Sequence, residues 1–126
     1  MMTPKSFSIR TLHVSAECAP LAKAGGLADV AGSLPKALVG LDIDARVLMP
    51  AWPGVIERAA NMGYLNRERL GQISVAIDWR AWTADVYEAV VGGTHVYLLE
   101  QPELFSNPYL YPERINETTA LPFVFL

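Results

Sequence analysis

Lys23-Ala24-Gly25-Gly26-Leu27 is the stretch that decides the fold of this 126-residue chain. It follows a β-branched, apolar run at residues 8–15, and apolar residues at helical spacing begin at its last position. A strand, a glycine loop and a helix in this order predict the start of a βαβ unit. Residues 44–49 supply the second strand, which Pro50 closes. The two strands are expected to be parallel, with a right-handed crossover.

The helix after the loop is predicted from an amphipathic pattern. Its apolar positions are Leu27, Val30, Ala31, Leu34 and Leu38. Pro35 lies inside the pattern and lacks a backbone donor, so we expect a kink or a break there. Gly40 is expected to stop the helix.

The second half of the chain has a different, antiparallel character. A short helix is expected at 55–62, and apolar residues alternate at 73–77. Two further strands are predicted at 86–91 and 94–99, joined by Gly92-Gly93 in a tight hairpin turn. The last of these strands is apolar on both faces and should return to the main sheet. The fold class is therefore α/β: a Rossmann-like parallel sheet with an antiparallel hairpin insertion.

The end of the chain is unusually apolar. Residues 101–113 contain three prolines and predict a loop with a short helical turn near residue 104. The final residues, 121–126, are mostly apolar, whereas free termini are usually polar. Either the chain stops inside a larger fold, or this segment docks on its own core. An exposed sheet edge and an apolar tail would make the chain self-associate.

Composition restricts the class of partner. The chain is 52% hydrophobic and 18% charged, with a net charge of −3 and no basic run, so we expect no nucleic-acid partner. It lacks an apolar stretch of signal-peptide or membrane-spanning length. A single cysteine, Cys18, suits a small apolar filler in a reducing cytoplasm. No metal site or cofactor is predicted, because no cluster has metal-ligand spacing.

The glycine loop has the chemistry of a phosphate site. Its spacing is neither the Rossmann fingerprint nor a Walker A loop, since Lys23 precedes the glycines and the next glycine is Gly32. A lysine beside two glycines still allows a cation and bare backbone N–H groups to approach an anion together. The positive end of the helix dipole adds to this. In open α/β sheets, ligands bind at the carboxyl ends of strands, where this loop lies.

Two carboxyl groups near the loop have alternative interpretations. Asp29 lies in the first helical turn, where it either complements the dipole and caps N–H groups or accepts hydrogen bonds from sugar hydroxyls. Glu17 follows the first strand and is either a cleft carboxylate or a solvated loop residue.

Other polar and aromatic residues have structural interpretations. His13 should be satisfied inside its strand, and His95 should be exposed beside the hairpin turn. Four aromatic residues could stack on sugar rings or pack locally: Tyr109, Tyr111, Trp79 and Trp82.

Residues 14–30 read V-S-A-E-C-A-P-L-A-K-A-G-G-L-A-D-V and contain every fixed position of S-x-E-x-x-P-x-x-K-x-G-G-L-x-D-V. This stretch closely resembles the N-terminal signature of bacterial glycogen synthases and plant starch synthases. The second strand at 46–50 and the segment 96–111 are also similar to that family. The resemblance is expected to end near Pro112, with 113–126 matching poorly.

The resemblance implies a two-domain GT-B enzyme that transfers glucose from ADP-glucose to the non-reducing end of an α-1,4-glucan, with retention of configuration. Residues 1–126 would be a partial N-terminal catalytic domain without the C-terminal domain, and inactive alone. The alternatives are a non-catalytic glucan- or partner-binding remnant and a GT-B enzyme with another donor.

The resemblance also implies substrate-binding residues. Lys23 would contact the donor diphosphate, and Gly25 and Gly26 would let the backbone approach the sugar phosphate. Asp29 and Glu17 would lie near the cleft. It assigns no catalytic residue within this chain.

Overall fold

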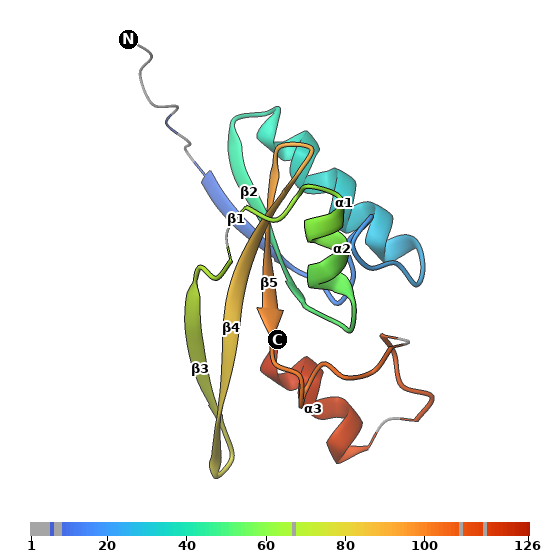
Figure 1. The fold of residues 1–126 in the computed structure, drawn as a ribbon. Coiled ribbons are helices and arrows are strands. Elements are labelled where there is room, and N and C mark those ends of the chain that lie inside the picture. The colour runs from blue at the N-terminus through green and yellow to red at the C-terminus, as the bar shows by residue number, and fades with distance from the viewer. Residues whose placement is uncertain (1–5, 7–8, 67, 109, 115) are drawn as a thin grey trace.

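A computed structural model describes residues 6, 9–66, 68–108, 110–114 and 116–126. Within these residues the chain forms one five-stranded sheet with helices packed against it (Figure 1). The strands, in spatial order, are β1 (Ile9–Val14), β2 (Ile43–Pro50), β5 (Thr94–Glu100), β4 (Arg80–Val91) and β3 (Gly71–Ile77). The helices are α1 (Gly26–Val39), α2 (Val55–Asn61) and α3 (Glu117–Phe125).

The parallel part of the sheet confirms the predicted βαβ unit. β1 pairs in parallel with β2, and β2 pairs in parallel with β5. α1 connects β1 to β2, and the N–H of Ser15 extends the ladder by donating to Leu48 O at 3.0 Å. The carboxyl ends of three parallel strands therefore meet at one edge, where the loop into α1 also begins.

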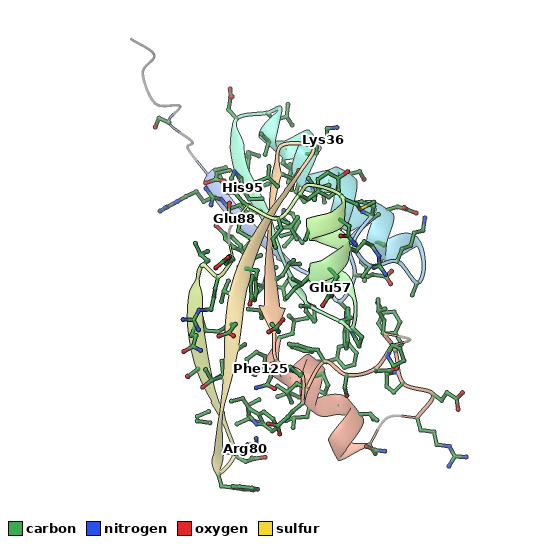
Figure 2. All side chains as sticks on the ribbon, in the orientation of Figure 1. Lys36, Glu57, Arg80, Glu88, His95 and Phe125 are labelled. Atoms are coloured by element: carbon green, nitrogen blue, oxygen red, sulfur yellow. The ribbon has the colours of Figure 1, made fainter. Side chains whose placement is uncertain are left out.

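The antiparallel part contains two hairpins. β4 and β5 pair around Gly92-Gly93, whose φ angles of 57° and 86° require glycine-like freedom and confirm the predicted turn. β4 begins at Arg80 rather than near residue 86, because its first half pairs with β3 in a second hairpin. This second turn was not predicted from the sequence; in it Asp78 takes a left-handed φ of 55°. Arg80 lies at the far tip of that hairpin, distant from His95 and Glu88 in Figure 2.

Of the kink or break predicted at Pro35, the break is excluded, because α1 runs without interruption from Gly26 to Val39. The Pro35 ring is buried, and its packing offsets the one hydrogen bond that proline cannot donate. The helix ends at Gly40 as predicted. α2 also confirms its predicted start at Val55. None of the helices in the described ranges has the length and apolar character needed to cross a bilayer.

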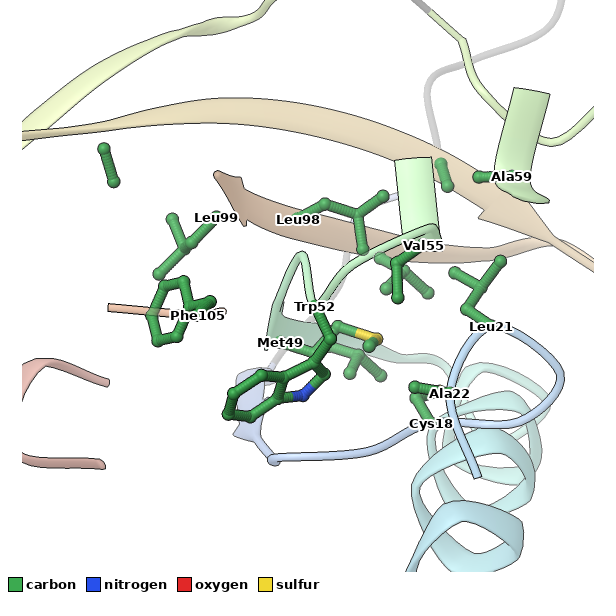
Figure 3. Packing of buried hydrophobic residues seen from close by; sticks show 14 of the residues in the cluster. Cys18, Leu21, Ala22, Met49, Trp52, Val55, Ala59, Leu98, Leu99 and Phe105 are labelled. Carbon is green, nitrogen blue, oxygen red and sulfur yellow. The ribbon is translucent and has the colours of Figure 1, made fainter. Parts of the chain in front are cut away.

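The core lies between the sheet and the helices α1 and α2, which cover the same face (Figures 1 and 3). A row of aromatic side chains extends this core toward the C-terminus. The ring centroids of Trp52 and Phe105 are 5.4 Å apart, and those of Phe105 and Phe125 are 5.9 Å apart. Phe125 is buried, so the last segment does dock on its own core, although Val124 on the same helix is 64% exposed.

Candidate functional site

The loop at residues 23–25 lies between the carboxyl end of β1 and the first turn of α1. Gly25 is the N-cap of α1, with an extended backbone and no side-chain capping bond. The first N–H groups of a helix lack intrahelical partners and form the positive end of its dipole. The carboxyl end of β1, the glycine loop and the start of α1 therefore lie together, as the sequence predicts.

Glu17 lies beneath this loop and is 1% exposed, so the interpretation as a solvated loop residue is wrong. Its Oε2 accepts a hydrogen bond from Ala24 N at 2.9 Å. Its Oε1 accepts one from Ala28 N at 3.0 Å. The carboxylate therefore joins the two sides of the glycine pair.

Lys23 and Asp29 form an ion pair above the start of α1. Lys23 Nζ lies 2.9 Å from Asp29 Oδ1 and 2.8 Å from Oδ2, and the two side chains are 54% and 58% exposed. The helix has no side-chain cap, so Asp29 acts in the first turn through its charge and its pairing with Lys23. An exposed ammonium held in place by a carboxylate remains available to an anion.

The glycine pair has an open outer surface. A methyl group added to Gly25 or Gly26 would meet no atom within 4 Å, and neither residue has a positive φ. Nothing in the described chain therefore requires glycine at these positions. An approaching ligand would require it, because a bare backbone allows the closest contact.

Tyr111 reaches the same site from the loop before α3. Its ring stacks on Phe123 with centroids 6.2 Å apart and an 8° interplanar angle. Burial, followed by the charge of Glu17 and a hydrogen bond with it, raises the pKa of the Tyr111 hydroxyl. In the sequence Tyr111 stands out only as an aromatic residue, and no pattern there signals this contact.

Comparison with known proteins identifies the family. The model of the starch synthase catalytic domain family matches residues 10–126. The chain is 39% identical over 107 residues to a glycogen synthase of Paracoccus denitrificans, covering 82% of this chain and 21% of that protein. It is 44% identical over 91 residues to a glycogen synthase of Thermus thermophilus, covering 72% of this chain and 18% of that protein.

The chain belongs to the starch synthase catalytic domain family. It spans about a fifth of the length of the curated glycogen synthases that it matches. Glycogen and starch synthases are glycosyltransferases. The solved catalytic domain of starch synthase IV from Arabidopsis thaliana shares the fold, with a TM-score of 0.60 and 23% identity over 86% of this chain and 22% of that one. The predicted α/β, GT-B-like fold class is therefore confirmed.

The family match corrects one prediction. It continues to residue 126, so the expectation that the resemblance ends near Pro112 is wrong. The segment contains α3, which a capping box at Asn116 begins and whose Phe125 packs on the core. This segment therefore forms a helix packed on the core, although it contains none of the motif positions that carried the resemblance.

Both histidines of this starch synthase family member have a side-chain partner. His13 contacts Thr11 Oγ1 at 3.1 Å, as expected for a satisfied strand residue. His95, which was predicted to be exposed, is half-buried, and its Nδ1 lies 2.6 Å from Glu88 Oε1 (Figure 2). Among the residues that the structure describes, no group of three or more His, Cys, Asp or Glu side chains could hold a metal ion.

The aromatic candidates divide into buried and exposed residues. Trp82 is buried beneath the Arg80 guanidinium, which lies 3.7 Å from its ring centroid, so it packs locally. Trp79 is 91% exposed, so it does not pack locally. Tyr109 lies outside the described residues.

Proposed function

We propose that this chain supplies the donor-phosphate side of a retaining glucosyltransferase that elongates an α-1,4-glucan from ADP-glucose. The observation that carries the proposal is the open glycine pair at the start of α1, beside the exposed ammonium of Lys23. Ligands of open α/β sheets bind at this edge. The Arabidopsis starch synthase IV domain, which shares the fold, was solved with ADP and acarbose.

The proposed chemistry is stabilisation of the leaving group. When the bond from glucose to the donor phosphate breaks, negative charge develops on ADP. Lys23 and the backbone N–H groups of Gly25 and Gly26 would meet this charge in positions set before the reaction, which is the most effective form of electrostatic catalysis. Asp29 would hold Lys23 near the cleft, and a phosphate would share or replace this pairing.

Residues 1–126 would form part of an N-terminal catalytic domain, with the other wall of the cleft supplied by a C-terminal domain. The chain covers 20% of the length of the Geobacillus glycogen synthases that it matches, which supports this division. We therefore expect the isolated chain to bind ADP without transferring glucose. The proposed location is the cytoplasm.

A lysine substitution tests the proposed diphosphate contact. Lys23→Ala should weaken ADP binding by about 1.5–3 kcal/mol, the cost of one charge-assisted hydrogen bond, measured by calorimetric titration of the 126-residue chain. Lys36→Ala is the matched control, because Lys36 is also exposed on α1 but lies in its last turn. Equal affinities for the two variants would contradict the proposed site.

Two assays separate the alternatives. Incubation of the chain with ADP-glucose and glycogen should yield no glucan elongation, and elongation would disprove the proposed inactivity. Glycogen binding without ADP binding would instead favour a non-catalytic remnant. Tighter binding of UDP than of ADP would favour a GT-B enzyme with a different donor.

A further inference from the structure

The buried carboxylate of Glu17 supports the glycine loop from below. Backbone N–H groups on both sides of the glycine pair donate to it, Ala24 at 2.9 Å and Ala28 at 3.0 Å. Because both amides donate to one rigid carboxylate, the distance between them is fixed. The shape of the intervening backbone is thereby restricted.

Two further segments lie next to Glu17. Ser15 Oγ donates to the backbone oxygen of Glu17 at 2.7 Å, at the end of β1. Tyr111, whose ring stacks on Phe123 of α3, lies near enough to Glu17 that, besides burial, the charge of the carboxylate raises the pKa of the Tyr111 hydroxyl. Glu17 thus lies between the end of β1, the start of α1 and the segment that precedes α3.

The position of Glu17 argues against direct contact with a diphosphate. The side chain is 1% exposed, and both oxygens already accept backbone hydrogen bonds. A carboxylate near a diphosphate is also repelled by it, because like charges repel strongly where water is excluded. Any benefit to binding must therefore come from loop geometry.

We propose that Glu17 is a positioning residue, which holds the amides of Ala24 and Ala28 so that Gly25 and Gly26 present their backbone to the donor diphosphate. The role rests on the proposed function. The change in ADP affinity on replacing Glu17 distinguishes an effect of its charge from an effect on loop geometry, because the two have opposite signs. Removing the charge alone would strengthen anion binding, whereas losing the loop geometry would weaken it.

The test compares Glu17→Gln with the wild-type chain, using ADP as the probe. In the carboxylate, Ala24 N and Ala28 N donate to different oxygens. The glutamine amide replaces one of these oxygens with an NH₂ group, so one backbone N–H group then faces a donor instead of an acceptor. We expect ADP affinity to fall roughly tenfold, by analogy with the loss of a hydrogen-bond partner that orients a metal ligand. The measurement is ¹⁵N NMR titration at temperatures where the variant is folded. Glu103→Gln, which removes an exposed carboxylate paired with Arg80, should leave ADP affinity unchanged.

The outcomes distinguish this role from the proposed function. Unchanged or tighter ADP binding by folded Glu17→Gln would overturn the role of Glu17 and leave the donor site standing. Absence of ADP binding by the wild-type chain would overturn both.

A measurement on the wild-type chain covers the case in which Glu17→Gln fails to fold. The amide of Ala24, which donates to Glu17, should exchange slowly with solvent deuterium before ADP is added; the amide of Ala28 is shared with Gly25 O at 3.3 Å and reports less directly on Glu17. Exchange of the Ala24 amide as fast as in an unstructured peptide would overturn the proposal.

Discussion

The carbonyl oxygen of Ala19 lies so close to Gly32 that a methyl group added to Gly32 would be 2.9 Å from it. Ala19 N donates to Ala28 O at 3.0 Å. Because this hydrogen bond holds the loop against α1, the carbonyl group of Ala19 cannot easily move away from Gly32. Gly32→Ala should therefore lower the free energy of unfolding by about 1–3 kcal/mol, the usual cost of overpacking. Alanine's helix propensity, about 1 kcal/mol better than that of glycine, offsets part of this. Urea denaturation of both proteins measures the difference, and a more stable variant would contradict the contact.

Gly26→Ala should have the opposite effect on stability. The added methyl group meets no atom within 4 Å, and Gly26 is the first residue of α1. Alanine should stabilise the helix by up to about 1 kcal/mol. The same methyl group would cover the backbone surface proposed to meet the diphosphate, so ADP affinity should fall. Urea denaturation and ADP titration of one preparation test both parts, and unchanged ADP affinity would weaken the proposed site.

The sequence predicted the fold where a local signal was strong. The glycine pair Gly92-Gly93 indicated the hairpin, and a β-branched, apolar run indicated β1. The second hairpin was missed because Trp79 follows Asp78 where a two-residue turn usually has glycine, although Asp78 adopts the required backbone. The unbroken α1 was missed because burial of the Pro35 ring depends on tertiary packing.

The sequence predicted the place of the candidate site better than the arrangement within it. Lys23 and the glycine pair were indicated by their residue types and by their place between the first strand and the helix. The contacts of Glu17 join residues seven and eleven positions apart through a loop, and no periodic pattern reports such a contact. Tyr111 and Glu17 lie near each other although most of the chain separates them in sequence, and no local pattern reports such a contact.

The ion pair between Lys23 and Asp29 should contribute little to stability. Both side chains are more than half exposed, and ion pairs in such positions typically contribute less than about 1 kcal/mol. A double-mutant cycle with Lys23→Ala and Asp29→Ala, followed by urea denaturation, should give a coupling energy below that value. The coupling should shrink further in roughly 1 M salt, which screens exposed charges. A salt-independent coupling of several kcal/mol would show that the pair is structural.

The edge strand β1 should promote self-association of the isolated chain. β1 lies at one edge of the described sheet, and its Leu12 and Val14 are each about half exposed. α1 adds further exposed apolar side chains, among them Val30. Size-exclusion chromatography should show a larger apparent mass at higher concentration. Leu12→Lys should reduce it, because edge lysines oppose strand pairing. A sharp monomer peak of the wild-type chain at high concentration would contradict this.

Cys18 should make the stability of the chain depend on alkaline pH. Burial raises the pKa of its thiol from the ordinary 9.0 to about 11. Between these two values the unfolded chain loses the proton while the folded chain keeps it. The free energy of unfolding should therefore fall as pH rises from about 9 toward 11. Urea denaturation at about pH 8, 9 and 10 measures the slope, and Cys18→Ala, which lacks the thiol, should show a shallower one. Equal slopes for the two proteins would show that Cys18 ionises as readily in the folded chain as in the unfolded one.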